Sequence, residues 1–457
     1  MIRFLFGVLI VFAVLGRADG FGERDRPMID LLPEAVFPEL KDLLGRSAEA
    51  SPRMIEEALR EMEVRGEAEA AGSRIYPSIT GNLRYVGRVE ERSDLNGHRT
   101  SGQPQAGLLL RQPLYHWGAL RAESRAGRIR EEIATHNRAE AYRLLALEIR
   151  SRYLDLVLQS RGIEVATAER DLLQEELRVS ESLLERDEIA LDAVRETRLA
   201  AEEASLRLDR LRRESEFSHA AFARLVGDET GFPESFPDVV PPLDTGYSGS
   251  EYRFGVLARR EDGYRPGLET ARQRALEAEN RRDAERSRVR PNLNLVAGVT
   301  QDQVAVFDRS DIDRTVLFAG VEVRWNIFDG FEARGRRAAA TARQRLEERR
   351  LDREERERAA GIERIESSLL FAERELKLAE SRLELAGESL ERKSGEFDEG
   401  RLSEKDLARA RIEYMRTELA VIERRAEYLM MFAEYLSEAG FDPIMDSFAA
   451  RTPNIEY

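Results

Sequence analysis

An internal duplication with an interval of about 213 residues limits the folds that this chain can adopt. Residues 107–114 (GLLLRQPL) and 320–327 (GVEVRWNI) place a glycine, an arginine and an aliphatic residue at matching positions, since 320 − 107, 324 − 111 and 327 − 114 each equal 213. Pro77 and Pro291 each precede a strand-like segment, and a long charged helical stretch follows each copy. Such a repeat is too long for a solenoid unit and indicates a duplicated half-molecule.

The N-terminus has the pattern of a secretory signal peptide. Arg3 precedes an apolar run from Phe4 to Leu15, and small residues follow at positions 16, 18 and 20. This order of a positive, an apolar and a small-residue region predicts cleavage and export, with a retained anchor as the alternative. The rest of the sequence contains no stretch of about 18 apolar residues, so any further crossing of a membrane would have to use strands.

Composition excludes several classes of function. Charged residues make up 35% of the 457 residues, the mean hydropathy is −0.50 and the formal net charge is −15. This acidic balance argues against nucleic-acid binding, and the absence of cysteine excludes disulfides and thiolate metal sites. The four histidines lie far apart in the sequence, and we find no phosphate-binding glycine loop or nucleophile elbow. We therefore expect neither an enzyme nor a cofactor.

Each copy begins with two segments in which apolar and polar residues alternate. In the first copy the apolar residues run from Ile79 to Val89 and from Ala106 to Leu110. In the second copy they run from Leu293 to Val299 and from Leu317 to Ile327. We expect residues 90–104 to form a solvated loop, and a second loop near residues 308–314. Alternation over about ten residues is typical of outer-membrane barrel strands, although a half-buried strand of a soluble sheet shows the same pattern.

The number of strands restricts the possible assemblies. Two strands per copy give four in the chain, whereas bacterial barrels begin at about eight strands. Either the sheet is soluble, or several chains share one barrel.

Each strand pair is followed by a long helical stretch, from about Ala119 to Val226 and from about Glu332 to Ala439. In the second stretch an apolar residue recurs every seven positions, with mostly alanine three positions further on, which predicts a closely packed coiled-coil seam. The outward-running seam comprises Ile362, Leu369, Leu376, Leu383, Leu390 and Phe397, and the returning arm carries Leu407, Tyr414, Val421, Tyr428 and Tyr435. The first copy keeps the interval less cleanly, because Arg170 interrupts it.

These features together resemble the TolC-type outer-membrane efflux proteins, over about residues 52–440. Residues 76–79 (YPSI) resemble the opening of the family's first strand, and residues 111–118 resemble its strand-to-helix junction, with 328–330 (FDG) as the second-copy partner. Residues 222–227 (FARLVG) resemble the end of the first hairpin, and 397–410 (FDEGRLSEKDLARA) resemble the tip of the second.

The resemblance implies a mixed α+β fold, mainly α, in which a unit of two strands and a long helical hairpin occurs twice. Three chains would share a twelve-stranded outer-membrane barrel, continued by an α-helical periplasmic tunnel. The implied function is passive export in a tripartite efflux or type I secretion system, with a periplasmic adaptor and an inner-membrane pump as partners. We expect a signal peptide, an irregular lead-in, a first repeat, a linker, a second repeat and a tail at residues 1–20, 21–51, 52–227, 228–265, 266–440 and 441–457.

The resemblance also suggests site residues. By motif match Asp406 falls on an acidic position of the tunnel entrance, while Arg409 replaces a second acidic residue and would partly compensate its charge; ordinary solvated helix charges are the alternative. The tips expected to contact the adaptor are Gly400, Arg401, Leu402 and Ser403 in the second copy and Asp187, Glu188, Ile189 and Ala190 in the first. The strand expected to face lipid carries Leu317, Ala319, Val321, Val323 and Trp325.

A soluble periplasmic coiled-coil adaptor or scaffold is the competing interpretation. Adaptors also contain a long hairpin, but they usually have one hairpin between split β-rich domains. Two hairpins, each preceded by a strand pair, favour the outer-membrane channel.

Overall fold

The computed structural model describes residues 31–92, 97–227, 236–243, 263–304 and 312–450. The expected signal peptide, residues 1–20, and most of the expected linker, 228–265, lie outside these ranges. The chain divides into two compact units, and both units contain parts of both repeats. Unit 1 comprises residues 1–57, 139–265 and 357–457, and unit 2 comprises residues 58–138 and 266–356.

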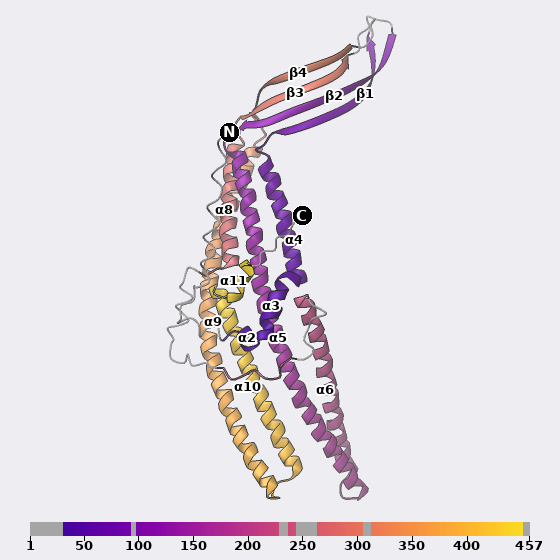
Figure 1. Cartoon of the computed structure of the whole chain (residues 1–457), viewed down its shortest axis with the longest axis vertical. Coiled ribbons are helices and arrows are strands. Elements are labelled where there is room, and N and C mark those ends of the chain that lie inside the picture. Colours follow the sequence, from indigo (N-terminus) through magenta and orange to yellow (C-terminus); the bar gives the residue numbers. More distant parts are fainter. Residues whose placement is uncertain (1–30, 93–96, 228–235, 244–262, 305–311, 451–457) are drawn as a thin grey trace, which may run out of the picture. The chain divides into compact units, whose positions relative to one another are not determined.

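Unit 2 contains one antiparallel sheet of four strands in the order β1-β2-β3-β4 (Figure 1). The strands are β1 (Ser78–Arg92), β2 (Gly97–Tyr115), β3 (Asn292–Val304) and β4 (Ile312–Arg324). Strands β2 and β3 are paired, so the two copies of the repeat form one continuous sheet. Each strand is longer than the nine to eleven residues or so that a tilted strand needs to cross a bilayer.

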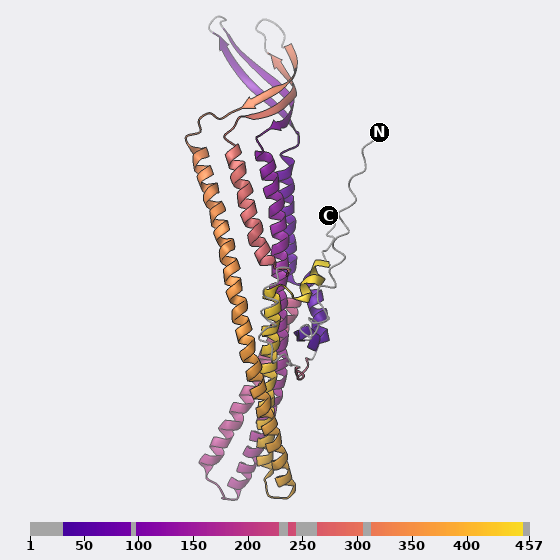
Figure 2. The ribbon, with the colours of Figure 1, turned by 90° about the vertical axis from the view of Figure 1, so that its left-hand side faces the viewer.

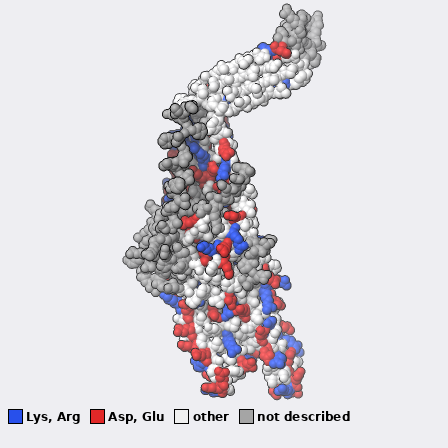
Figure 3. All heavy atoms as spheres, viewed as in Figure 1, with Lys and Arg blue, Asp and Glu red and all other residues white. Residues whose placement is uncertain are grey.

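The register gathers the apolar residues on one face of this sheet. Across the strands, Gly81, Leu108, Val299 and Leu317 lie in one row, and Ile79, Leu110, Ala297 and Ala319 lie in the next row. The row between them, on the opposite face, contains Thr80, Leu109, Gly298 and Phe318. The next rows of that face contain Asn82, Gly107, Thr300 and Val316, and Ser78, Arg111, Val296 and Gly320. Because successive side chains point to opposite faces, one face is largely apolar and the other is mixed polar. Figure 3 shows few charged atoms over the sheet.

Two expectations about the strands were wrong. Residues 90–92 and 97–104 are not a loop, because the pairing of β1 with β2 continues to Arg92↔Gly97; residues 93–96 lie outside the described residues. Ladder hydrogen bonds thus override the Ser, Gly and Asn content of this segment. Strand β4 ends at Arg324, so Trp325 lies just beyond it and donates from Nε1 to the carbonyl oxygen of Val289 at 3.3 Å.

The helices match the expected limits. Helices α5 (Ala119–Glu185) and α6 (Leu191–Val226) follow the first strand pair, and α9 (Glu332–Asp398) and α10 (Glu404–Ala439) follow the second. Helices α6 and α10 both end at a left-handed glycine, Gly227 and Gly440, as is common for helix C-termini. Helix α4 (Pro52–Ser73) precedes β1, and α8 (Pro266–Ser287) precedes β3. In the part of the chain that the structure describes, no helix is long and apolar enough to span a membrane.

Within unit 1 the seven-residue interval marks the buried seam of the second hairpin. Helix α9 buries Ile362, Leu369 and Leu376, and it also buries Ala372 between the larger residues. Helix α10 returns with the buried residues Leu407, Val421, Tyr428 and Tyr435. Toward the tip Leu383, Leu390 and Phe397 are only half-buried. The seam confirms the predicted coiled-coil packing.

The described part of the expected irregular lead-in, residues 31–51, is largely helical. Helices α2 (Pro33–Val36) and α3 (Pro38–Ala50) occupy most of residues 31–50. Leu40, Leu43 and Leu44 are fully buried with residues of α5 and α6 in the main core of unit 1. The sequence pattern missed these helices because they are short and depend on packing rather than on periodicity. The expected tail likewise contains a helix, α11 (Pro443–Ala450).

A buried ion network joins three distant segments of unit 1. Arg150 of α5 is fully buried, and Glu34 of α2 and Asp442, just before α11, both accept hydrogen bonds from its guanidinium. The Nε–Oε2 distance to Glu34 and the Nη2–Oδ1 distance to Asp442 are both 2.9 Å. Burial by itself would lower the pKa of Arg150, but Asp442 and then Glu34 raise it above its ordinary value. The arginine therefore stays charged and holds both termini of the described chain on α5.

We predict that Arg150→Met will strongly destabilise unit 1, because Asp442 and Glu34 would remain as buried carboxylates without a cation. Breaking a buried pair in this way costs about 3–5 kcal/mol. Denaturant unfolding, followed by far-ultraviolet circular dichroism, measures the loss in the free energy of unfolding. Arg178→Met is the control, because that arginine pairs with Glu175 on an exposed surface. Equal unfolding midpoints for the two variants would contradict the prediction.

Candidate functional site

The tips of the two helical hairpins have the same backbone conformation. Gly400 and Asp187, which correspond in the repeat, both adopt a left-handed conformation with φ of 73° and 56°. The residue after each bonds back to the preceding helix: the Arg401 amide donates to the carbonyl oxygen of Glu396 at 2.8 Å, and the Glu188 amide to that of Leu183 at 2.9 Å. The duplication therefore conserves the turn, although an aspartate replaces the glycine that accommodates this conformation best. Figure 2 shows both turns, at the ends of α5 and α9.

The side chains at the two tips differ. Ser403 is the N-cap of α10, and its hydroxyl accepts from the Asp406 amide at 3.1 Å and donates to the Asp406 carboxylate at 2.6 Å. The Ser403 hydroxyl thus caps the helix and also holds the Asp406 carboxylate at the first turn. Ala190 is the N-cap of α6 and provides no side-chain cap. The helix after the second tip is thus held at its first turn, whereas the helix after the first tip is not.

The two sequence-predicted entrance residues have different surroundings. Asp406 is exposed at the tip, in the first turn of α10. Arg409, three positions further on, donates to Glu176 of α5 at 2.9 Å, so its guanidinium has a carboxylate partner other than Asp406. Lys405 lies 3.2 Å from the same glutamate. Glu176 was not among the predicted residues, because nothing in its local sequence distinguishes it from the many other glutamates of α5.

Further ion pairs join the two hairpins above their tips. Arg416 of α10 donates from Nε to Glu169 of α5 at 2.7 Å, and Glu418 of α10 accepts from Arg161 of α5. Together with Glu176 these pairs form a ladder between α5 and α10 inside unit 1. The residues of this ladder are at least partly exposed, so each ion pair alone contributes little to the free energy of unfolding. The ladder therefore fixes which helices are neighbours more than it stabilises the fold.

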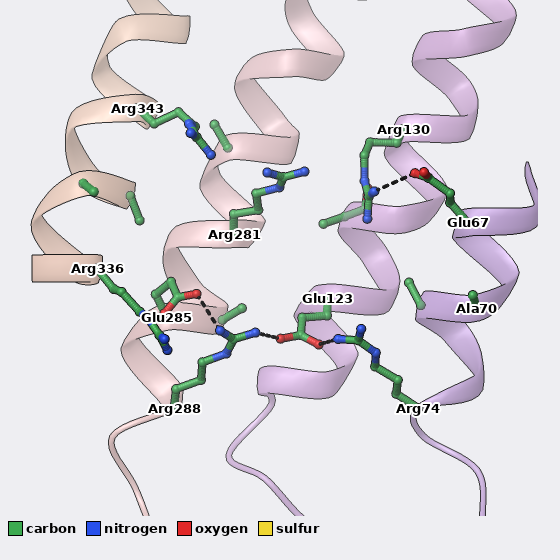
Figure 4. A pocket seen from close by; sticks show the side chains of 16 residues that line it. Glu67, Ala70, Arg74, Glu123, Arg130, Arg281, Glu285, Arg288, Arg336 and Arg343 are labelled. Atoms are coloured by element: carbon green, nitrogen blue, oxygen red, sulfur yellow. Dashed lines mark hydrogen bonds and ion pairs between the residues drawn. The ribbon is translucent and has the colours of Figure 1, made fainter. Parts of the chain in front are cut away.

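A polar groove lies on one face of α4, α5, α8 and α9 in unit 2 (Figure 4). Its volume is about 540 Å³, and alanines form much of its floor. Its charged lining comprises Arg74, Arg130, Arg281, Arg288, Arg336 and Arg343 with Glu67, Glu123 and Glu285.

Most of these arginines have carboxylate partners. Glu123 is shared by Arg74, at 3.1 Å, and Arg288, and Arg130 lies 3.4 Å from Glu67. Arg343 has no ion pair within the described residues, and its guanidinium points into the same space as that of Arg281 in Figure 4. With six arginines and three glutamates, the lining of the groove carries a net positive charge.

The groove continues toward the polar face of the sheet. A neighbouring hollow shares Arg74, Glu123 and Arg288 with the groove and is also lined by His116 and Asn292. The His116 ring Nε2 lies 2.9 Å from Oδ1 of Asn294, a residue on the mixed polar face of β3. The mixed polar face of the sheet and the groove thus adjoin each other within unit 2. Within the described ranges, no three His, Asp or Glu residues are grouped as a metal site.

The residues expected to face lipid lie on the opposite, apolar face. Leu317, Val321 and Val323 are all more than half exposed, and so is Trp325 just past the strand. Ala319 lies between them on the same face and is also exposed. The exposure extends to β1, where Ile79, Leu83, Tyr85 and Val89 are at least two-thirds exposed. A contiguous apolar face of this extent marks a surface that another molecule or a lipid phase covers.

Comparison with known proteins agrees with this architecture. The family model of the outer membrane efflux protein matches residues 43–228 and 260–434. No curated protein matches the chain in sequence.

The fold is shared with several solved structures at low sequence identity. The Campylobacter jejuni CmeC outer membrane channel is 12% identical, with a TM-score of 0.70 over 88% of this chain and 86% of that one. The Vibrio cholerae outer membrane protein VceC is 16% identical, with a TM-score of 0.67 over 88% and 96%. The Neisseria gonorrhoeae MtrE outer membrane channel, solved in an open state, is 16% identical, with a TM-score of 0.68 over 89% of each chain.

The difference between the tips predicts opposite effects of two matched substitutions. Ser403→Ala should destabilise the first turn of α10 by about 1 kcal/mol, because the Asp406 amide loses its cap. Ala190→Ser, at the corresponding position, should stabilise the first turn of α6 by a similar amount. Hydrogen exchange of the amides just after each tip measures both effects. Equal exchange in the wild-type tips, unchanged by either substitution, would contradict this assignment.

Proposed function

The chain belongs to the outer membrane efflux protein family and is an outer-membrane efflux channel of the TolC type, and we propose that three copies form one passive duct through the outer membrane and periplasm. Members of the family form trimeric channels. The observation that carries the proposal is the four-stranded sheet with an exposed apolar face. Four strands are too few to close a barrel, whereas three chains would supply twelve.

The two faces of the sheet assign the inside and the outside of this barrel. The apolar face would contact lipid, because a strand in a bilayer must satisfy its backbone by pairing and expose only apolar side chains to the hydrocarbon. The polar face, with the Arg111–Glu322 pair at 3.4 Å, would line the water-filled passage. Because the arginine-lined groove of unit 2 is continuous with this polar face, the groove would form the wall of the duct below the strands.

The helical hairpins would continue the passage through the periplasm. Within unit 1 the tips at residues 187–190 and 400–403 are exposed or partly exposed and form turns that a partner can reach. We assign them to contact with a periplasmic adaptor, and we assign the supply of energy to an inner-membrane pump. The chain itself carries no feature of an energy-coupling enzyme, since the sequence contains no phosphate-binding glycine loop.

The lipid assignment predicts that Leu317→Arg will prevent stable insertion. Leu317 lies near the middle of β4 and is 79% exposed. An arginine facing lipid near the midplane costs about 2–4 kcal/mol. Thr300→Arg is the matched control, because Thr300 lies on the opposite face in the neighbouring strand. Membrane flotation and the yield of heat-resistant trimers on gels measure insertion. Equal yields of inserted trimer for the two variants would contradict the assignment of the apolar face to lipid.

The entrance assignment predicts a change in ion passage for Asp406→Asn. If Asp406 from three copies lines a constriction, the variant should conduct better in planar bilayers and should lose block by multivalent cations. Ser403→Ala separates two explanations, because it removes the helix cap but keeps the carboxylate. Block that persists in Asp406→Asn, or that disappears equally in Ser403→Ala, would show that Asp406 acts as a helix-cap residue rather than at a constriction.

A further inference from the structure

The arginines of the groove in unit 2 form two tiers (Figure 4). Arg281 and Arg288 of α8 and Arg336 and Arg343 of α9 have the same spacing, since 288 − 281 and 343 − 336 both equal 7. Helix α8 runs toward β3 and α9 runs away from β4, so Arg288 and Arg336 are both nearer the strands. Seven residues extend about 10 Å along a helix. The far tier comprises Arg281, Arg343 and Arg130, and the near tier comprises Arg288, Arg336 and Arg74.

The floor between the two tiers is small and apolar. All four helices of the groove contribute alanines to it, and these are Ala70, Ala71, Ala126, Ala284, Ala339 and Ala340. A methyl group leaves space above it, so an apolar body can lie flat on this floor. The groove volume of about 540 Å³ is in the range of small-molecule sites.

Carboxylates hold the near tier in place. Glu123 accepts from Arg288 and lies 3.1 Å from Arg74. Arg336 pairs with Glu332, which lies outside the lining of the groove. Side chains that are already fixed lose little freedom when a ligand binds, so this tier is preorganised.

The far tier has fewer carboxylates than arginines. Arg130 lies 3.4 Å from Glu67 and 3.6 Å from Glu277, and Glu277 also pairs with Arg281. Arg343 has no ion pair within the described residues, and Figure 4 shows its guanidinium directed toward that of Arg281. A guanidinium has five donors in a planar fork that matches a carboxylate or phosphate group. The far tier therefore has charge and donors in excess of its partners.

We propose that the groove binds an elongated organic anion, with an apolar body on the alanine floor and an anionic group at each tier, about 10 Å apart. One anionic group would lie at Arg281 and Arg343, and the other at Arg288 and Arg336. Carboxylate, sulfonate and phosphate groups share the chemistry that the arginines recognise. Binding depends on the groove alone, whereas a role as a station for anionic cargo rests on the duct proposed above.

Calorimetric titration of the detergent-extracted full chain with the para,para′-disulfonate of biphenyl tests the site. This rigid probe has a sulfonate at each end of an apolar body. Arg343→Gln should weaken its binding about tenfold, because charge-assisted hydrogen bonds to one sulfonate are lost. Arg349→Gln is the matched control, since Arg349 lies on the same helix outside the groove and its side chain is 80% exposed. Equal affinities of the two variants, or no binding to the wild type, would overturn the proposal.

A second probe tests whether both tiers bind. The para-monosulfonate of biphenyl keeps the apolar body and one anionic group, so it should bind about tenfold more weakly than the disulfonate. Ala339→Phe should abolish the binding of both probes without any change in charge, because its ring covers the floor. Equal affinities of the wild type for the two probes would contradict a ligand that reaches both tiers.

Planar-bilayer recording separates this site from the duct. The disulfonate should reduce ion passage through the wild-type channel, and Arg343→Gln should require about ten times as much for the same block. If the wild type conducts but binds no probe, the site is wrong and the duct proposal stands. If the protein binds the probe but forms no channel, the site stands, and the duct and the role in cargo passage both fail.

Discussion

The structure depends on one constraint: the chain cannot bury the apolar face of its own sheet. Four strands pair in sequence order, and every second row of the register belongs to this face from β1 to β4. The opposite face is mixed in polarity and adjoins an arginine-lined groove. The apolar face is an external surface, and in the proposed barrel lipid covers it.

The same reasoning applies to the helices in a milder form. Each hairpin buries one seven-residue seam internally. The apolar core of unit 1 contains residues of both α5 and α10, and ion pairs join these two helices nearer the tips. Exposed or half-exposed ion pairs contribute little free energy. Ion pairs near the tips specify which helices are neighbours without fixing them rigidly, which suits hairpins whose tips are proposed to contact an adaptor.

The duplication preserves the backbone more faithfully than the side chains. Turns, helix limits and glycine caps recur in both copies, yet Ser403 caps one helix where Ala190 leaves the other uncapped. Backbone geometry at a tight turn tolerates few solutions, so both copies keep it. Side chains at a tip have no such restriction and can diverge as their partners differ. The same divergence separates the clean heptads of the second copy from the interrupted ones of the first.

The sequence by itself determined the elements of this protein, because alternation with period two and heptads with period seven are local properties that the chain repeats twice. It therefore predicted the limits of α5, α6, α9 and α10, the two-faced strands and the turn at each tip. It could not predict the contacts that join distant segments. Arg150 meets Glu34 and Asp442, and Arg409 meets Glu176, across separations of more than one hundred residues. In a sequence with 72 basic and 87 acidic residues, the choice of partner depends on which helices pack together. Only the tertiary structure decided that choice, and it also turned the expected irregular lead-in into packed helices, since short helices gain their stability from the core that they contact.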